Sequence, residues 1–168
     1  RDRYDTFGSF KWFINLFGIH LFPTSIVNLC LFPLYFYFIE NSTSVGSLDY
    51  LICLFTFSMV LLEQISDEQM HTFKRNITNK DKTMNQGLWQ YSRHPNYLGE
   101  VGFWFGLCGF GLIGSNGSLI LLICPIAMLL MFMFASIPMM DNRSLENRPD
   151  YAEYMKKTSS LMILPIKK

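Results

Sequence analysis

Four apolar segments, each close to the length that crosses a bilayer as a helix, constrain the fold of this chain more than any other feature. They cover roughly residues 12–39, 48–65, 97–114 and 118–140. A helix needs about 20 residues to span the hydrocarbon layer, where a helix satisfies its own backbone hydrogen bonds. Buried helices of a soluble protein are the alternative, but four of them in 168 residues would leave little polar surface to cover them. The pattern predicts an all-α membrane protein with about four transmembrane helices.

Composition supports the membrane environment. Half of the residues are hydrophobic and 16% are charged, whereas a soluble domain carries about 25% charged residues. The net charge of +1 and the absence of a basic arm give no sign of a nucleic-acid partner. The four cysteines lie singly inside apolar runs without CxxC spacing, so we expect buried or lipid-facing thiols and no metal site.

The basic residues predict the topology. Segments 1–11, 66–96 and 141–168 hold all 14 Lys and Arg, while the connections 40–47 and 115–117 hold none. Because cytoplasmic loops are enriched in Lys and Arg, both termini and the 66–96 loop are expected in the cytoplasm. The protein is thus predicted to be multi-pass, in the endoplasmic reticulum of a eukaryote or otherwise in an inner membrane.

Local signals modify the first span and the tail. Pro23 and Pro33 are expected to kink the first span or to mark a turn before it. Tyr151, Tyr154 and Met155 follow Pro149 at helical spacing, which predicts a short cytoplasmic amphipathic helix on the membrane face. The apolar run 161–165 is expected to tuck against that helix.

The strongest chemical signal is GLWQYSRHPNYLGEVGFW at residues 87–104. Arg93 and His94 precede a proline that suits a first helical turn, and Asn96 and Glu100 lie one turn apart. A carboxylate inside a span is costly without a partner, so Glu100 is a functional candidate. The structural alternative is a Glu hydrated at the interface or paired with Arg93.

A second signal runs out of the second span. Glu63, Asp67, His71 and Lys74 form one polar stripe if the helix is continuous. Such a stripe needs a polar partner, which a bound dinucleotide or a neighbouring helix would supply. A solvated helix end is an equally good interpretation.

The tail is the third signal. Its basic residues and tyrosines, among them Arg143 and Tyr154, suit phosphate and an aromatic ring. Anionic lipid is the alternative partner of such a segment. No P-loop motif is present, and a nucleotide site would be built from helix ends and loops rather than from a Rossmann turn.

These motifs together resemble a known family. GLWQYSRHPNYLGE, the E-x3-D-x3-H-x2-K stripe before it and RPDYAEYMKKTS after it resemble the steroid 5-alpha-reductase C-terminal-like membrane proteins, and most of all their uncharacterised branch. The superfamily also includes sterol reductases and isoprenylcysteine carboxyl and phospholipid methyltransferases. The likeness runs through residues 1–168, taken as a single transmembrane domain. The opening RDRY resembles an internal stretch, so N-terminal spans are expected to be missing.

The resemblance implies an NADPH-dependent reductase, an oxidoreductase of lipid metabolism that acts on a carbon–carbon double bond in a steroid- or lipid-like substrate. It implies that NADPH binds at Asp67, His71, Lys74, Lys82, Arg93, His94, Asn96, Tyr97, Glu100, Arg143 and Tyr154. The reductases often carry Asn where Glu63 stands and Arg where His71 stands. Their catalytic acids lie in the N-terminal half, so no catalytic residue is predicted here.

Two other functions compete with the reductase. The first is an S-adenosylmethionine-dependent membrane methyltransferase, but such enzymes tend to carry paired Glu residues after the last span. The corresponding stretch here reads MMDNRSLE, without adjacent acids. The second is a non-enzymatic protein that binds lipid through a degenerate site. The intact Arg93, His94, Asn96 and Glu100 argue against it.

Overall fold

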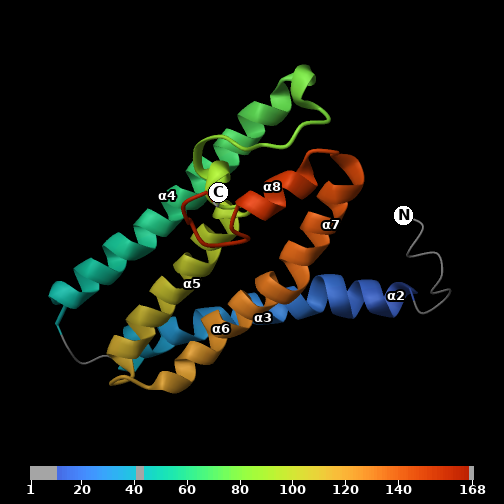
Figure 1. The fold of residues 1–168 in the computed structure, drawn as a ribbon. Coiled ribbons are helices and arrows are strands. Elements are labelled where there is room, and N and C mark those ends of the chain that lie inside the picture. The colour runs from blue at the N-terminus through green and yellow to red at the C-terminus, as the bar shows by residue number, and fades with distance from the viewer. Residues whose placement is uncertain (1–10, 41–43, 167–168) are drawn as a thin grey trace.

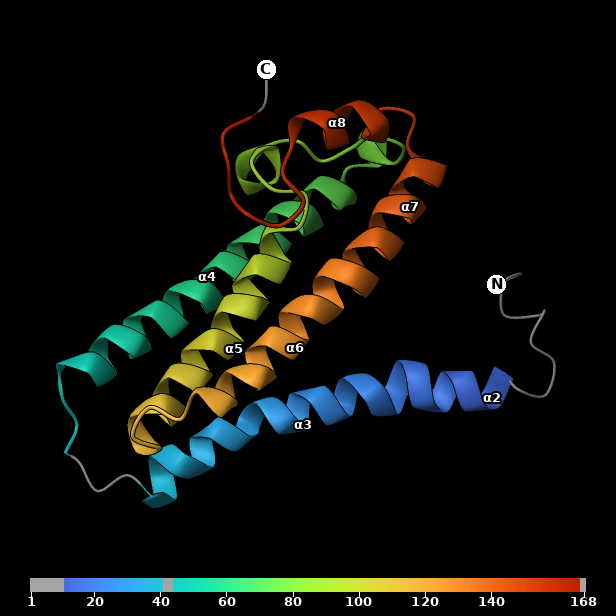
Figure 2. The same ribbon diagram turned by 60° about the horizontal axis from the view of Figure 1, so that its bottom comes forward.

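The helices form a bundle in which three long helical rods run side by side and a fourth crosses them obliquely (Figures 1 and 2). The computed structural model describes residues 11–40 and 44–166, and in these ranges it contains helices and loops but no β-strand. The described elements are α2 (Lys11–Ile14), α3 (Phe22–Tyr35), α4 (Ser47–Arg75), α5 (Pro95–Gly114), α6 (Ile123–Met131), α7 (Ile137–Asn147) and α8 (Tyr151–Lys157). The prediction of an all-α fold is confirmed.

Among the residues that the structure describes, four helical stretches are long and apolar enough to cross a membrane. They are Phe22–Glu40, Ser47–Arg75, Pro95–Gly114 and Leu119–Asn147, which confirms the four predicted spans. The second and fourth extend beyond their predicted ends at residues 65 and 140, because their helices continue past the apolar sequence into a polar one. The polar stripe of α4 therefore does lie on one unbroken helix, as expected.

Proline shapes the first and fourth spans without ending them. A π-helical segment, Asn15–Leu21, directly precedes α3 with its Pro23, and another, Phe132–Ser136, precedes α7 with its Pro138. The proline ring clashes with the carbonyl four residues earlier, and a wider turn relieves that clash. Pro33 lies inside α3, which continues through it. The predicted interfacial turn is therefore replaced by helix that widens locally.

Glycines bring α4 and α5 into close contact. A Cβ added at Gly99 would lie 2.7 Å from the backbone oxygen of Met59, and one at Gly106 would collide with the side chain of Thr56. Lipid gives little hydrophobic drive for helix association, so close backbone packing through small residues holds such helices together. This contact fixes the polar end of α4 beside the start of α5.

The other face of α5 packs on α3 and α6. Buried side chains from the three helices form one cluster: Ile26, Cys30, Val101, Trp104, Cys124, Met128 and Phe132. By contrast, Leu51, Leu54 and Phe57 on α4 are 57–65% exposed and face outward, as lipid-contacting residues do. Of the four cysteines, three are buried and Cys53 is exposed, which matches the expectation from sequence.

The tail forms the predicted short helix α8, whose Tyr151 and Tyr154 are buried. It lies across the same end of the bundle as the C-terminal ends of α4 and α7 (Figure 2). Of the apolar run after it, Leu161 is buried but Met162, Ile163 and Leu164 are exposed. The prediction that this whole run tucks in is therefore wrong, because beyond Leu161 it is the backbone that is attached, through the Leu164 N–H to the Tyr91 carbonyl at 3.3 Å, while the side chains stay exposed.

The glycine contact yields a matched test. Gly106→Ala is expected to lower the melting temperature in detergent, by an amount equivalent to about 1–3 kcal/mol of overpacking. Gly109→Ala is the control, because its added Cβ would meet the flexible end of Ile52 at 3.2 Å. Both changes gain the same helix propensity. Equal melting temperatures for the two variants would contradict the close α4–α5 contact.

Candidate functional site

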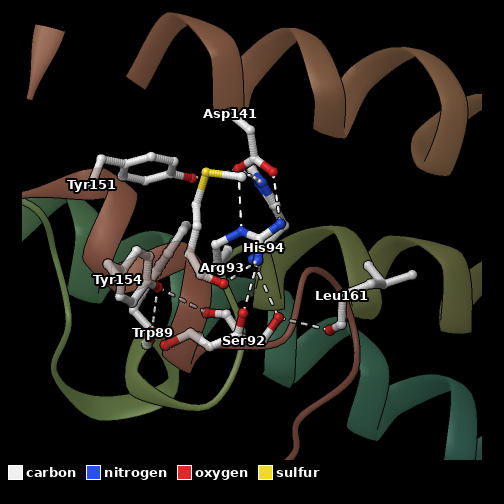
Figure 3. A network of polar contacts seen from close by, with 10 residues as sticks. Trp89, Ser92, Arg93, His94, Asp141, Tyr151, Tyr154 and Leu161 are labelled. Atoms are coloured by element: carbon white, nitrogen blue, oxygen red, sulfur yellow. Dashed lines mark hydrogen bonds and ion pairs between the residues drawn. The ribbon is translucent and has the colours of Figure 1, made fainter. Parts of the chain in front are cut away.

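A buried carboxylate joins three segments at the polar end of the bundle. Asp141, near the end of the fourth span, is 5% exposed and contacts three side chains (Figure 3). Its Oδ2 accepts from Arg93 Nη2 at 2.8 Å, and its Oδ1 lies 3.1 Å from His94 Nε2. The hydroxyl of Tyr151 donates to Oδ1 at 2.5 Å. Asp141 therefore links α7 to the start of α5 and to α8.

Arg93 divides its donors between this carboxylate and the end of α8. Its Nη1 donates to the carbonyl oxygens of Thr158 at 2.8 Å and Met155 at 3.3 Å. The last carbonyls of a helix lack intrahelical partners, so a guanidinium satisfies them well. The backbone N–H of Arg93 donates to the Ser159 carbonyl at 2.8 Å. The guanidinium of Arg93 is thus engaged in contacts that hold the fold together.

Ser92 and Tyr154 complete the attachment of the tail. The Ser92 hydroxyl donates to the Leu161 carbonyl at 2.7 Å, and the Tyr154 hydroxyl donates to the Trp89 carbonyl (Figure 3). Trp89 Nε1 in turn donates to the Ser66 carbonyl on α4 at 3.0 Å. The segment before α5 is therefore clamped between α4 and the tail.

Burial keeps both tyrosines in their neutral, donating form. The pKa of Tyr151 is raised well above its ordinary value by burial and by its hydrogen bond to Asp141. Burial likewise raises the pKa of Tyr154. Since a phenol ordinarily loses its proton near pH 10, both hydroxyls donate throughout the physiological range.

The loop after α4 is fixed at two points. Thr83 donates to the carboxylate of Asp150 from its backbone N–H at 3.1 Å and from its hydroxyl at 2.6 Å. Burial alone would raise the pKa of Asp150, but these bonds and Arg148 outweigh it and lower that pKa. Gln69 on α4 accepts from the backbone N–H of Leu88 at 3.0 Å. The loop is therefore held against both α4 and the tail.

These attachments enclose a polar cavity of about 170 Å³ between α4, the start of α5, the end of α7 and α8. Seven of the eleven residues predicted to bind cofactor line it: Asp67, Lys74, Arg93, His94, Asn96, Tyr97 and Tyr154. Ser144, Arg148 and Tyr151 also line it. We refer to it as the polar cavity.

Asn96 carries an unmet hydrogen-bonding group in this cavity. Its Oδ1 is buried and accepts no hydrogen bond from any residue that the structure describes. A buried polar atom without a partner is unfavourable and calls for an unseen ligand or water. The ring of Tyr97, also in the lining, stacks on His94 with centroids 5.1 Å apart.

The remaining four predicted residues lie outside the lining of the polar cavity. His71, Lys82 and Arg143 are exposed, and Glu100 is half-buried further along α5. Arg93 pairs with Asp141, so the structural alternative in which it pairs with Glu100 is not what the structure shows. Within residues 11–40 and 44–166, no cluster of His, Cys, Asp and Glu has the arrangement of a metal site.

Sequence reasoning missed Asp141, Tyr151 and Arg148. The available signal for Asp141 was an acid directly after an apolar span, in the stretch MMDNR. That signal alone does not assign Asp141 to the site, because nothing in the sequence shows that Arg93 and His94 meet α7. The lining role of Arg148 depends on how α8 folds back over the bundle.

The fold and the site define a multi-pass helical membrane protein with a polar cavity at one end of its spans. The chain belongs to the family described as "Protein of unknown function (DUF1295)", whose model matches residues 1–158.

One curated relative has been found, the uncharacterized protein C594.04c of Schizosaccharomyces pombe. It is 30% identical over an alignment covering 65% of this chain and 38% of the relative. The chain therefore spans well under half of that relative's length. No solved structure matches the chain significantly.

Replacing the central carboxylate tests its structural role. Asp141→Asn leaves the buried Arg93 without its counter-ion, and breaking such a pair costs about 3–5 kcal/mol. We expect a clear fall in melting temperature. Glu146→Gln, an exposed acid on the same helix, is the control and should leave the melting temperature unchanged. Indistinguishable melting curves for the two variants would show that Asp141 does not hold the tail.

Proposed function

We propose that this chain forms the cofactor-binding part of an NADPH-dependent membrane reductase, which reduces a carbon–carbon double bond in a steroid- or lipid-like substrate. The observation that carries the proposal is the polar cavity with the unpartnered Oδ1 of Asn96. The resemblance of residues 87–100 to steroid 5-alpha-reductase-like proteins supports the same assignment.

The cavity suits one part of a dinucleotide. A volume of about 170 Å³ is below the roughly 300–1,000 Å³ of complete small-molecule sites, but it accommodates a ring-sized fragment. The Asn96 oxygen would accept from the amide group of a nicotinamide. The remainder of the cofactor would extend beyond this cavity.

Charge favours NADPH over S-adenosylmethionine. Lys74 and Arg148 line the cavity, while the carboxylate of Asp141 is neutralised by Arg93. NADPH carries several negative charges and S-adenosylmethionine carries a sulfonium cation. Asp141 lies outside the lining and Asp67 is the acid within it, but Lys74 and Arg148 outnumber Asp67, so the lining is the better match for the anion.

In this proposal the chain binds and orients, and the bound cofactor supplies the hydride. Asn96 would fix the ring by its amide, the His94–Tyr97 stack would form a wall, and Asp141 would hold that wall in place through His94. A lipid-like substrate would arrive laterally through the bilayer. The polar end of the bundle would face the cytoplasm, where NADPH is available.

Asn96 provides the sharpest test of the cofactor. Asn96→Ala is expected to weaken NADPH binding by the full-length protein in nanodiscs about two- to tenfold, the equivalent of one lost hydrogen bond of about 0.5–1.5 kcal/mol. Because Oδ1 has no described protein partner, the melting temperature should stay unchanged. Isothermal titration and thermal melting of the same preparation measure both quantities.

Asn142→Ala serves as the control for that experiment, because Asn142 is exposed on α7 and lies outside the lining of the polar cavity. Binding of S-adenosylmethionine without binding of NADPH would move the protein to the methyltransferase group. Binding of neither, together with saturable lipid binding, would indicate a non-enzymatic lipid-binding protein.

Orientation is tested separately. We expect both termini and the loop near Lys80 on the cytoplasmic face and Ser44 on the opposite face, because the basic residues alternate between connections. A single cysteine at position 44 or 80, in a background without other cysteines, should react with an impermeant maleimide from opposite sides. Labelling of position 44 from the cytoplasm would overturn this topology.

A further inference from the structure

A second cavity adjoins the polar cavity and is strongly basic. It has a volume of about 380 Å³ and lies between the end of α4, the loop that follows it and the segment before α8. Its charged lining residues are Lys74, Lys80 and Arg148, and no Asp or Glu lines it. Lys74 and Arg148 also line the polar cavity, so the two cavities lie next to each other.

The three cations are available for a ligand. None of them forms an ion pair within residues 11–40 and 44–166, where the cations that do are Arg93, His94 and Lys157. Arg148 interacts electrostatically with Asp150, but Asp150 lies outside the lining and is hydrogen-bonded to Thr83. Asp81, beside Lys80, is exposed and also lies outside the lining.

The geometry of the loop brings these charges together from separate parts of the chain. Lys74 lies in the last turn of α4, and Lys80 follows a short 3-10 helix, Ile77–Asn79. That helix is positioned by Asn76, which accepts from Thr78, and by Asn79, which donates to the Phe73 carbonyl at 3.1 Å. Cations near a helix C-terminus offset its dipole, which accounts for Lys74. Arg148, 74 positions later, likewise follows the last turn of α7, so the dipole accounts for each cation singly but not for their gathering at one cavity.

We infer that Lys74, Lys80 and Arg148 form a binding site for a phosphate ester with at least two phosphate charges, next to the polar cavity. Three cations without a neighbouring acid in the lining offer charge-assisted donors to phosphate oxygens, with Arg148 able to bind two at once. The phosphate chemistry stands on this geometry alone. Its identification as part of a nucleotide cofactor rests on the proposed function.

The height of the site favours a soluble phosphate over a lipid headgroup. A span of about 20 residues from Ser47 ends near Ser66. Lys74 then lies about 12 Å further along the helix, at 1.5 Å per residue. The headgroup layer on each face is about 5–8 Å thick. A soluble diphosphate therefore reaches Lys74 more readily than a lipid phosphate does.

The site changes which cations are expected to contact phosphate. Arg93 is committed to Asp141 and to the carbonyls of α8, and Lys82 lies outside the lining. Lys80 and Arg148, which the sequence did not single out, take their place. Phosphate binding and tail attachment thereby use different cations.

The experiment measures binding of inorganic pyrophosphate to the full-length protein in nanodiscs of zwitterionic lipid. Isothermal titration is carried out at constant ionic strength. Lys80→Gln and Arg148→Gln are each expected to weaken pyrophosphate binding about tenfold or more, the fold-change of one lost charge-assisted contact. Arg75→Gln is the matched control, since Arg75 is exposed beside Lys74 but outside the cavity. It should change the affinity less than twofold.

Each outcome decides one point. If Arg75→Gln and Lys80→Gln weaken pyrophosphate binding equally, the anion is held by diffuse surface charge and the proposed site is wrong. The site is also wrong if the protein binds neither pyrophosphate nor anionic lipid. Loss of binding to anionic nanodiscs in Lys80→Gln, without pyrophosphate binding, would retain the phosphate site and assign it to a headgroup. Pyrophosphate binding without NADPH binding would retain the site and reject the proposed reductase. NADPH binding that is unaffected by Lys80→Gln and Arg148→Gln would retain the proposed reductase and reject this phosphate site.

Discussion

The ion pair between Arg93 and Asp141 is the interaction on which the polar end of this protein depends. Both side chains are at least nine-tenths buried, and each needs the other to remain charged there. The pair joins the start of α5 to the end of the fourth span, and Arg93 extends the link to the last carbonyls of α8. Without it, α7 would lose its link to the start of α5, and His94 in the wall of the polar cavity would lose the carboxylate that positions it.

Close packing within the spans makes this arrangement possible. Gly99 and Gly106 let α5 approach α4 until side chains and backbone touch, so Asp67 and Lys74 on α4 come to face the segment around Asn96. Lipid contributes little to such a contact, and the helices are held by the fit of small residues. The apolar spans thereby set the width of a cavity made of polar residues.

The basic residues at the polar end of the bundle fall into two groups, one that stabilises the fold and one that lines a cavity without an ion pair to any described residue. Arg93 holds the fold and has its donors filled by Asp141 and backbone carbonyls. Lys74, Lys80 and Arg148 line an acid-free cavity and form no ion pair with the residues that the structure describes. A buried charge that is already paired is a poor phosphate ligand, because binding would require its partner to be given up. This division supports a phosphorylated ligand next to the unpartnered oxygen of Asn96.

The sequence by itself determined the four spans, the unbroken polar extension of α4 and the short tail helix, since these follow from hydropathy, helical period and proline placement along the chain. It also indicated seven of the residues that line the polar cavity, because four of them, Arg93, His94, Asn96 and Tyr97, are neighbours in one motif. Tertiary structure decided the rest. Only the folded chain brings Asp141 to Arg93 and Arg148 to Lys74, over separations of 48 and 74 positions. Which cation forms an ion pair within the protein and which stays available for a ligand depends on how α7 and α8 pack. No local sequence pattern encodes contacts between residues so far apart in the chain.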